Sequence, residues 1–88
     1  MKPFEIAIGK FMDEFSIQYY AELRIYFYNH EYLVRGRKFN KSKDYKYSIS
    51  ISPKHNREVF LEYFIEYDDI EKWLLNYFSK KELTLALQ

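Results

Sequence analysis

The spacing of apolar residues changes twice along this chain of 88 residues, and this limits the possible folds more than any other feature. Near the start, Phe4, Ile8, Phe11 and Phe15 recur at the spacing of one helix face. A proline at position 3 suits the first turn of a helix, because that position needs no backbone N–H. The sequence therefore predicts a helix over residues 3–15.

Residues 17–28 alternate apolar and polar side chains, which is the pattern of a strand with one buried face. We expect a two-residue turn at residues 29–30, followed by a partner strand over residues 31–39. The sequence therefore predicts a hairpin directly after the first helix.

The predicted turn fixes which residues of the hairpin face each other. It places Leu23 opposite Gly36, which leaves a gap that a helix side chain could fill. It also places Arg24 opposite Arg35, and like charges in that position are unfavourable. Either the loop is longer than two residues, or the arginine pair binds an anion.

A polar turn at residues 40–44 separates the hairpin from residues 45–52, where apolar and polar residues alternate most regularly. A loop over residues 53–57 follows. Residues 58–67 fit either a strand or a helix, and their valine, phenylalanine, tyrosine and isoleucine favour a strand. Three glutamates spaced four apart would also repel each other along a helix.

Asp68 and Glu71 have the spacing of a capping box with Asp68 as the cap residue, which predicts a helix from residue 69 to about residue 81. The tail over residues 83–87 fits either a frayed helix or a short added strand. Together the elements predict one α+β domain over residues 1–88. In it, an antiparallel sheet of three or four strands packs on one face against an N-terminal and a C-terminal helix.

The chain has no cysteine, so no disulfide can support so short a domain. Aromatic residues make up 22% of the sequence, and large rings can fill a small core. No apolar run approaches the roughly 20 residues that a membrane span requires. We therefore expect a folded cytoplasmic protein, in a bacterial host cell, that does not bind membranes.

The formal net charge of +1 conceals two opposed blocks. Residues 35–57 hold eight basic residues and one acidic residue, whereas residues 58–71 hold six acidic residues and no basic residue. The two blocks could neutralise each other across a hairpin, or each could bind a partner. Basic residues among aromatic ones in 35–57 are compatible with nucleic-acid binding. Residues 68–72, at the start of the last helix, have the wrong sign for a phosphate site, so this alternative is less favoured.

Two groups of residues are candidates for binding a protein partner. Tyrosine and arginine are enriched at binding hot spots, and the outer face of the hairpin would present Tyr20, Arg24, Tyr26, Tyr28, Arg35 and Arg37. Arrayed carboxylates can imitate the phosphates of a nucleic acid, and the acidic candidates are Glu58, Glu62, Glu66, Asp68 and Asp69. The tyrosine-rich face could also be the seam of a homodimer.

No pattern of catalytic residues is present. The chain lacks a cysteine nucleophile, a Gly-x-Ser-x-Gly sequence and a glycine-rich phosphate loop. His30 and His55 fall in predicted loops and do not have the spacing of a metal-binding pair. We therefore expect no enzymatic activity, no metal and no cofactor.

The small size, the order helix–strands–helix and the acidic segment from Glu58 to Glu71 resemble the inhibitors that phages and mobile elements make, anti-CRISPR proteins among them. With 10 Tyr and 8 Phe against 2 Gly and 2 Pro, the composition also indicates A/T-rich coding, which is common in such genomes. The resemblance implies a non-enzymatic protein that blocks a surface of a larger host protein, including proteins that bind nucleic acid. It includes no motif, so it implies no role for any single residue.

Overall fold

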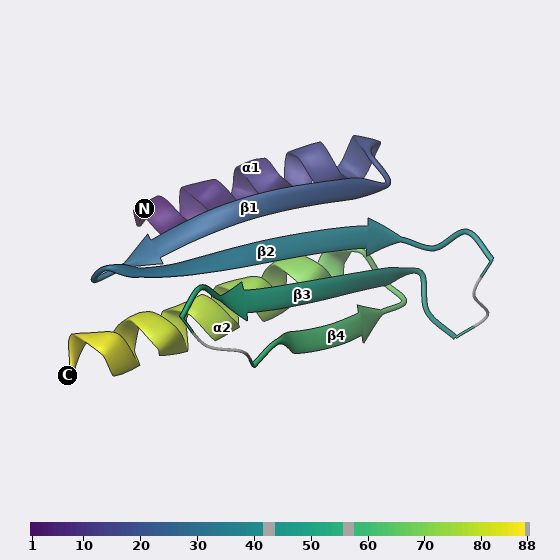
Figure 1. The fold of residues 1–88 in the computed structure, drawn as a ribbon. Helices are drawn as coiled ribbons and strands as arrows, with labels where there is room; N and C mark the ends of the chain where they lie inside the picture. Colours follow the sequence, from purple (N-terminus) through teal and green to yellow (C-terminus); the bar gives the residue numbers. More distant parts are fainter. Residues whose placement is uncertain (42–43, 56–57, 88) are drawn as a thin grey trace.

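A computed structural model describes residues 1–41, 44–55 and 58–87 and has an α+β fold (Figure 1). The predicted fold class is confirmed, residues 60–64 form a strand, and the tail continues the last helix. Parts of the predicted loops at 40–44 and 53–57 lie outside the described residues. In chain order the elements are α1 (Pro3–Ile17), β1 (Tyr20–Phe27), β2 (His30–Lys38), β3 (Tyr47–Pro53), β4 (Phe60–Phe64) and α2 (Asp68–Ala86).

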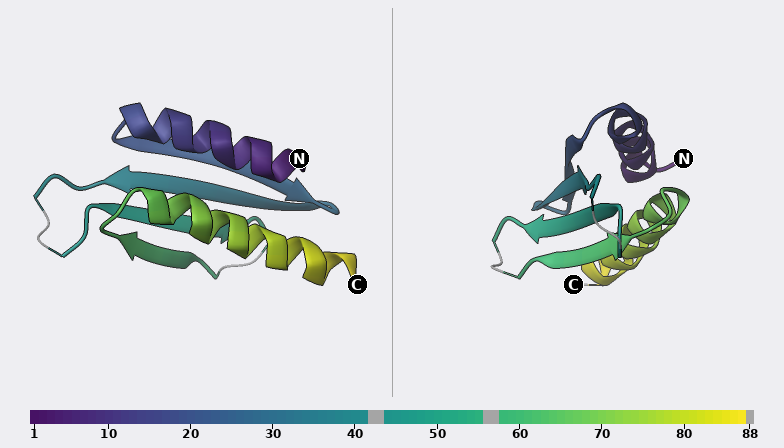
Figure 2. Two further views of the ribbon diagram at one scale, coloured as in Figure 1. Left: turned by 180° about the vertical axis from the view of Figure 1, so that it is seen from behind. Right: turned by 90° about the vertical axis from the view of Figure 1, so that its right-hand side faces the viewer.

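The four strands form one antiparallel sheet in the order β1-β2-β3-β4, so each strand pairs with the next one along the chain. Both helices lie on the same side of this sheet, as the end-on view in Figure 2 shows. The opposite side of the sheet is covered by neither helix. The core therefore lies in a single layer between the sheet and the helices.

Helix α1 buries the stripe that the sequence predicts, including Phe4, Ile8, Phe11 and Phe15. It ends at residue 17, two residues later than predicted. At its start the backbone N–H of Lys2 donates a hydrogen bond of 3.1 Å to the side chain of Glu5. This bond satisfies a donor that the helix itself cannot pair.

Two rings of α1 pack directly over Gly36 on β2. A Cβ atom at this position would lie 3.0 Å from the Cζ atoms of both Phe11 and Phe15. The prediction that a helix side chain fills this gap is therefore correct. Its neighbour across the strand pair is Ala21 rather than Leu23.

The turn of the first hairpin lies one residue earlier than the sequence predicts. Its two central residues are Tyr28 and Asn29, with φ of 45° and 69°. Two successive positive φ values match the twist of a two-residue hairpin, and asparagine tolerates this conformation well. The predicted turn at residues 29–30 is therefore wrong, and His30 begins β2.

This shift changes the cross-strand partners by two residues while keeping every side chain on its expected face. Arg24 lies opposite Leu33, and Arg35 lies opposite Glu22. The predicted pair of facing arginines therefore does not form. The hairpin avoids the repulsion through its register and needs no anion to relieve it.

Helix α2 does not use the predicted capping box. Asp68 is the first helical residue, and the cap residue Tyr67 makes no capping hydrogen bond through its side chain. The acidic residues of the first turn instead face the positive end of the helix dipole. The hydroxyl group of Tyr67 donates a hydrogen bond to the backbone carbonyl of Met12, which ties the start of α2 to α1.

The inward face of α2 carries Ile70, Leu74 and Phe78, all of them fully buried. The ring of Phe78 lies 6.0 Å from that of Phe27 and 5.7 Å from that of Tyr32. Aromatic rings in this range attract each other beyond the area they bury. The last helix thus closes the core over the middle of the sheet.

Candidate functional site

The uncovered side of the sheet, which we call the open face, presents every second residue of each strand. The alternate residues point at the helices and supply most of the buried core. The residues of the open face are Tyr20, Glu22, Arg24, Tyr26, Glu31, Leu33, Arg35, Arg37, Ser48, Ser50, Ser52, Leu61 and Tyr63.

Serines occupy β3 on the open face, and larger side chains on β2 and β4 flank them. One row across the sheet runs from Tyr20 to Arg37, Ser48 and Tyr63. The next row ends at Leu61, which is 51% exposed, and Tyr63 is 48% exposed. The arginines of β2 and the serines of β3 therefore lie between tyrosines on β1 and the pair of Leu61 and Tyr63 on β4.

The arginines of the open face are partly neutralised by their neighbours. The Nη1 atom of Arg24 lies 2.9 Å from Oε1 of Glu31, and the Nζ atom of Lys54 lies 3.2 Å from Oε2 of the same residue. Arg35 pairs with Glu22 at 3.7 Å. Hydrogen bonds from Arg24 and then from Lys54 lower the pKa of Glu31.

Arg37 is positioned differently from the other two arginines. Its guanidinium carbon lies 5.3 Å from the centre of the Tyr20 ring, which is within the range of a cation–π contact. The hydroxyl group of Tyr20 donates to Glu22, and this hydrogen bond is the main reason that the pKa of Tyr20 is raised. Tyr20 is thus oriented by Arg37 at its ring and by Glu22 at its hydroxyl.

The structure brings five of the six hairpin candidates together on the open face: Tyr20, Arg24, Tyr26, Arg35 and Arg37. The sixth, Tyr28, lies in the turn at one end of this face and is 62% exposed.

Sequence reasoning missed Leu61 and Tyr63 as part of the same surface. The alternation in residues 58–67 groups them on one side of a strand. It does not say whether that side faces the helices or the solvent.

The acidic candidates lie at the opposite edge of the sheet from β1, along β4 and the start of α2. Glu62 is on the helix side of β4, and Asp68 and Asp69 are in the first turn of α2. Within the described part of the chain, Glu62, Glu66, Asp68 and Asp69 form no ion pair. The basic residues that the structure describes therefore do not neutralise these four carboxylates, whereas Glu58 has an interaction partner.

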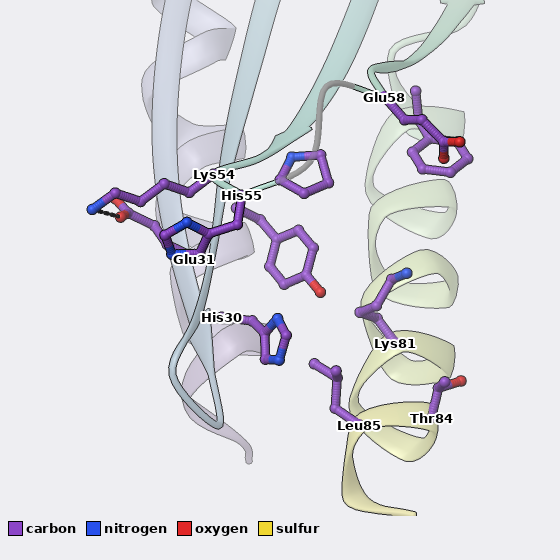
Figure 3. Close-up of a pocket in the computed structure, with 11 residues that line it drawn as sticks. His30, Glu31, Lys54, His55, Glu58, Lys81, Thr84 and Leu85 are labelled. Atoms are coloured by element: carbon purple, nitrogen blue, oxygen red, sulfur yellow. Dashed lines mark ion pairs between the residues drawn. The ribbon is translucent and has the colours of Figure 1, made fainter. Parts of the chain in front are cut away.

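A surface cavity of about 300 Å³ lies between the end of α2 and the nearby ends of β2 and β3. In Figure 3, His30 and His55 line one side, and Lys81, Thr84 and Leu85 line the other. The Nζ atom of Lys81 lies 5.5 Å from the centre of the Tyr77 ring. Among the described residues, no group of three or more His, Cys, Asp or Glu could hold a metal ion.

Comparisons of this chain with protein-family models, with curated proteins and with solved structures found no match. In the described part of the chain, neither helix is both long enough and apolar enough to cross a membrane. What the protein does must therefore be inferred from its own surfaces, and the open face gathers most of the hairpin candidates.

Proposed function

We propose that this protein is a small non-enzymatic binding domain that blocks a surface of a larger protein inside a bacterial host cell, as phage inhibitors of the anti-CRISPR type do. The observation that carries the proposal is the open face, where tyrosine and arginine side chains stand on a rigid sheet that neither helix covers. Residues of these two types dominate the binding energy of protein interfaces.

The charge arrangement on the open face favours a protein partner over a nucleic acid. Binding to nucleic acid gains most of its affinity from unpaired cations that displace counterions from phosphates. Here Arg24 is paired with Glu31, and Arg35 is paired with Glu22. A partner with its own mixture of charged and aromatic groups fits such a surface better than a uniformly negative one.

The test compares variants of the immobilised protein in affinity capture from its source cells, followed by titration of the purified partner. We expect the double change Tyr20→Ala and Tyr26→Ala to weaken binding at least tenfold, because truncated hot-spot residues cost about 2 kcal/mol or more. Tyr26 is 65% exposed, so the fold should persist, which circular dichroism can check. Leu83→Ala is the control, because Leu83 is equally exposed but lies on α2.

Three other results would redirect the proposal. If reversing the charges of Glu66 and Asp69 abolishes capture while the tyrosine change does not, acidic mimicry of nucleic acid through these residues replaces the open face. A salt-dependent shift of DNA or RNA mobility that Arg37→Ala reduces would instead indicate nucleic-acid binding. If light scattering shows a dimer and the tyrosine change makes the protein monomeric, the open face is the interface of a homodimer.

A further inference from the structure

The second edge of the sheet, formed by β4, carries features that the open face does not explain. Because β4 is last in the strand order, half of its backbone N–H and C=O groups point away from β3. Proteins usually protect such an edge with a short strand, charged side chains (lysine above all), proline, a bulge or a covering loop, and β4 is five residues long with Glu62 as its one charged residue. Residues 58–66 contain neither lysine nor proline. Figure 1 shows β4 as the outermost strand of the sheet.

Helix α2 packs against β4, so the strand and its free edge are already ordered before a partner binds. The ring of Phe60 lies 5.5 Å from that of Tyr77, and the ring of Phe64 lies 5.6 Å from that of Trp73. Both partners belong to α2. A strand that is already ordered loses little conformational freedom when another strand pairs with it.

Apolar side chains line this edge on the outer side. Leu61 and Tyr63 project from β4 onto the open face, and Val59 and Ile65, which flank the strand, are 56% and 59% exposed. Exposed apolar residues that are contiguous along a strand indicate a contact surface. The added partner should therefore carry apolar side chains on that side.

Acidic side chains favour basic residues in a partner strand on the helix side of β4. Glu62 lies on the same side of β4 as Phe60 and Phe64, and Glu66 follows four residues later. Neither carboxylate forms an ion pair in the part of the chain that the structure describes. Opposite charges that face each other across two strands are favourable, and like charges are not.

We propose that the free edge of β4 binds an extended segment of another protein as an added fifth strand, with lysine or arginine facing Glu62 and Glu66 and apolar residues beside Leu61 and Tyr63. Backbone hydrogen bonds would supply affinity and the alternating side chains specificity. A second copy of this chain fits less well, because two paired β4 edges would bring Glu62 of each copy to the same interface. This inference shares Leu61 and Tyr63 with the open face, and its test probes the β4 edge through Glu62, which lies on the other side of the sheet.

The test titrates the full chain with labelled peptides of about eight residues, read by fluorescence anisotropy. One peptide alternates lysine with valine, a second alternates glutamate with valine, and a third is the lysine peptide with alternate backbone nitrogens methylated. We expect only the unmodified lysine peptide to bind, because methylation removes the backbone donors that a new strand needs. In nuclear magnetic resonance spectra its largest amide shifts should lie in β4.

Two matched charge reversals locate the contact. We expect Glu62→Lys to weaken binding of the lysine peptide about tenfold and Glu14→Lys, on the exposed side of α1, to leave it unchanged. The proposal is overturned if both variants bind alike, if the methylated peptide binds as well as the unmodified one, or if no lysine peptide binds. It is equally overturned if light scattering shows a dimer that Glu62→Lys dissociates.

Discussion

Gly36 and Gly9 show how differently two glycines of one chain can be constrained. A side chain at Gly36 would collide with the rings of Phe11 and Phe15, whereas a Cβ atom at Gly9 would meet nothing within 4 Å. We therefore expect Gly36→Ala to lower the free energy of unfolding by about 1–3 kcal/mol, because overpacking forces the rings from their positions. Gly9→Ala should raise it by roughly 0.5–1 kcal/mol, because glycine weakens a helix interior.

Urea unfolding of the two variants checks both predictions. An unchanged dependence of the free energy of unfolding on urea concentration would show that the unfolded state is unaffected. Equal effects at the two positions would contradict the close approach of α1 to β2.

The hydroxyl group of Tyr77 is buried and has no hydrogen-bond partner among the described residues. Leaving such a group unpaired costs about 1–3 kcal/mol. We expect Tyr77→Phe to raise the free energy of unfolding by about 1 kcal/mol, measured by urea unfolding at neutral pH. Tyr19→Phe is the control, because Tyr19 is 66% exposed and removal of its hydroxyl group should change the free energy of unfolding little.

The same residue predicts how stability depends on alkaline pH. Burial raises the pKa of Tyr77 to about 12, from about 10 in an unfolded chain. The folded state therefore holds the phenol proton more tightly than the unfolded chain does, so ionisation of this group leaves the free energy of unfolding unchanged below about pH 10 and lowers it as the pH rises towards 12. Thermal melts across this range should fall less steeply for Tyr77→Phe, and parallel curves for the two proteins would contradict the assignment.

At the scale of single elements, the β1–β2 turn combines one suitable residue with one strained residue. Asn29 tolerates a positive φ, whereas Tyr28 adopts φ of 45° at a cost of roughly 1–2 kcal/mol. We expect Tyr28→Asn to raise the free energy of unfolding by about 1 kcal/mol, because asparagine is favoured in this turn. Asn29→Ala should lower it, and urea unfolding of both variants checks the two signs together.

The sequence predicted best the helix and strand in which the spacing of apolar residues matches the spacing of the buried positions. The stripe from Phe4 to Phe15 predicted α1, and the alternation around Ile49 and Ile51 predicted β3. Turn and cap positions were less predictable, because they depend on backbone angles and tertiary contacts. Tyr28 has a positive φ that an aromatic residue rarely adopts, and Tyr67 bonds to Met12 across the core.

For the whole molecule, the candidate site was predictable only in part. Which strand residues are exposed depends on the side of the sheet that the two helices cover. The sequence grouped Tyr20 with Tyr26 on one face of a hairpin, and the structure places them there. It could not indicate that Leu61 and Tyr63 continue this face, because residues 58–67 alternate equally well for either orientation. The free edge of β4 became apparent only from the strand order.

That strand order also has a consequence for how the chain folds. Every strand pairs with the one that follows it, so no strand must wait for a distant segment before it can join the sheet. Contacts between near neighbours close small loops and favour fast folding. The last helix then packs Leu74 and Phe78 against the sheet and contacts α1. We therefore expect assembly to follow the order of the elements along the chain, with α2 completing the core.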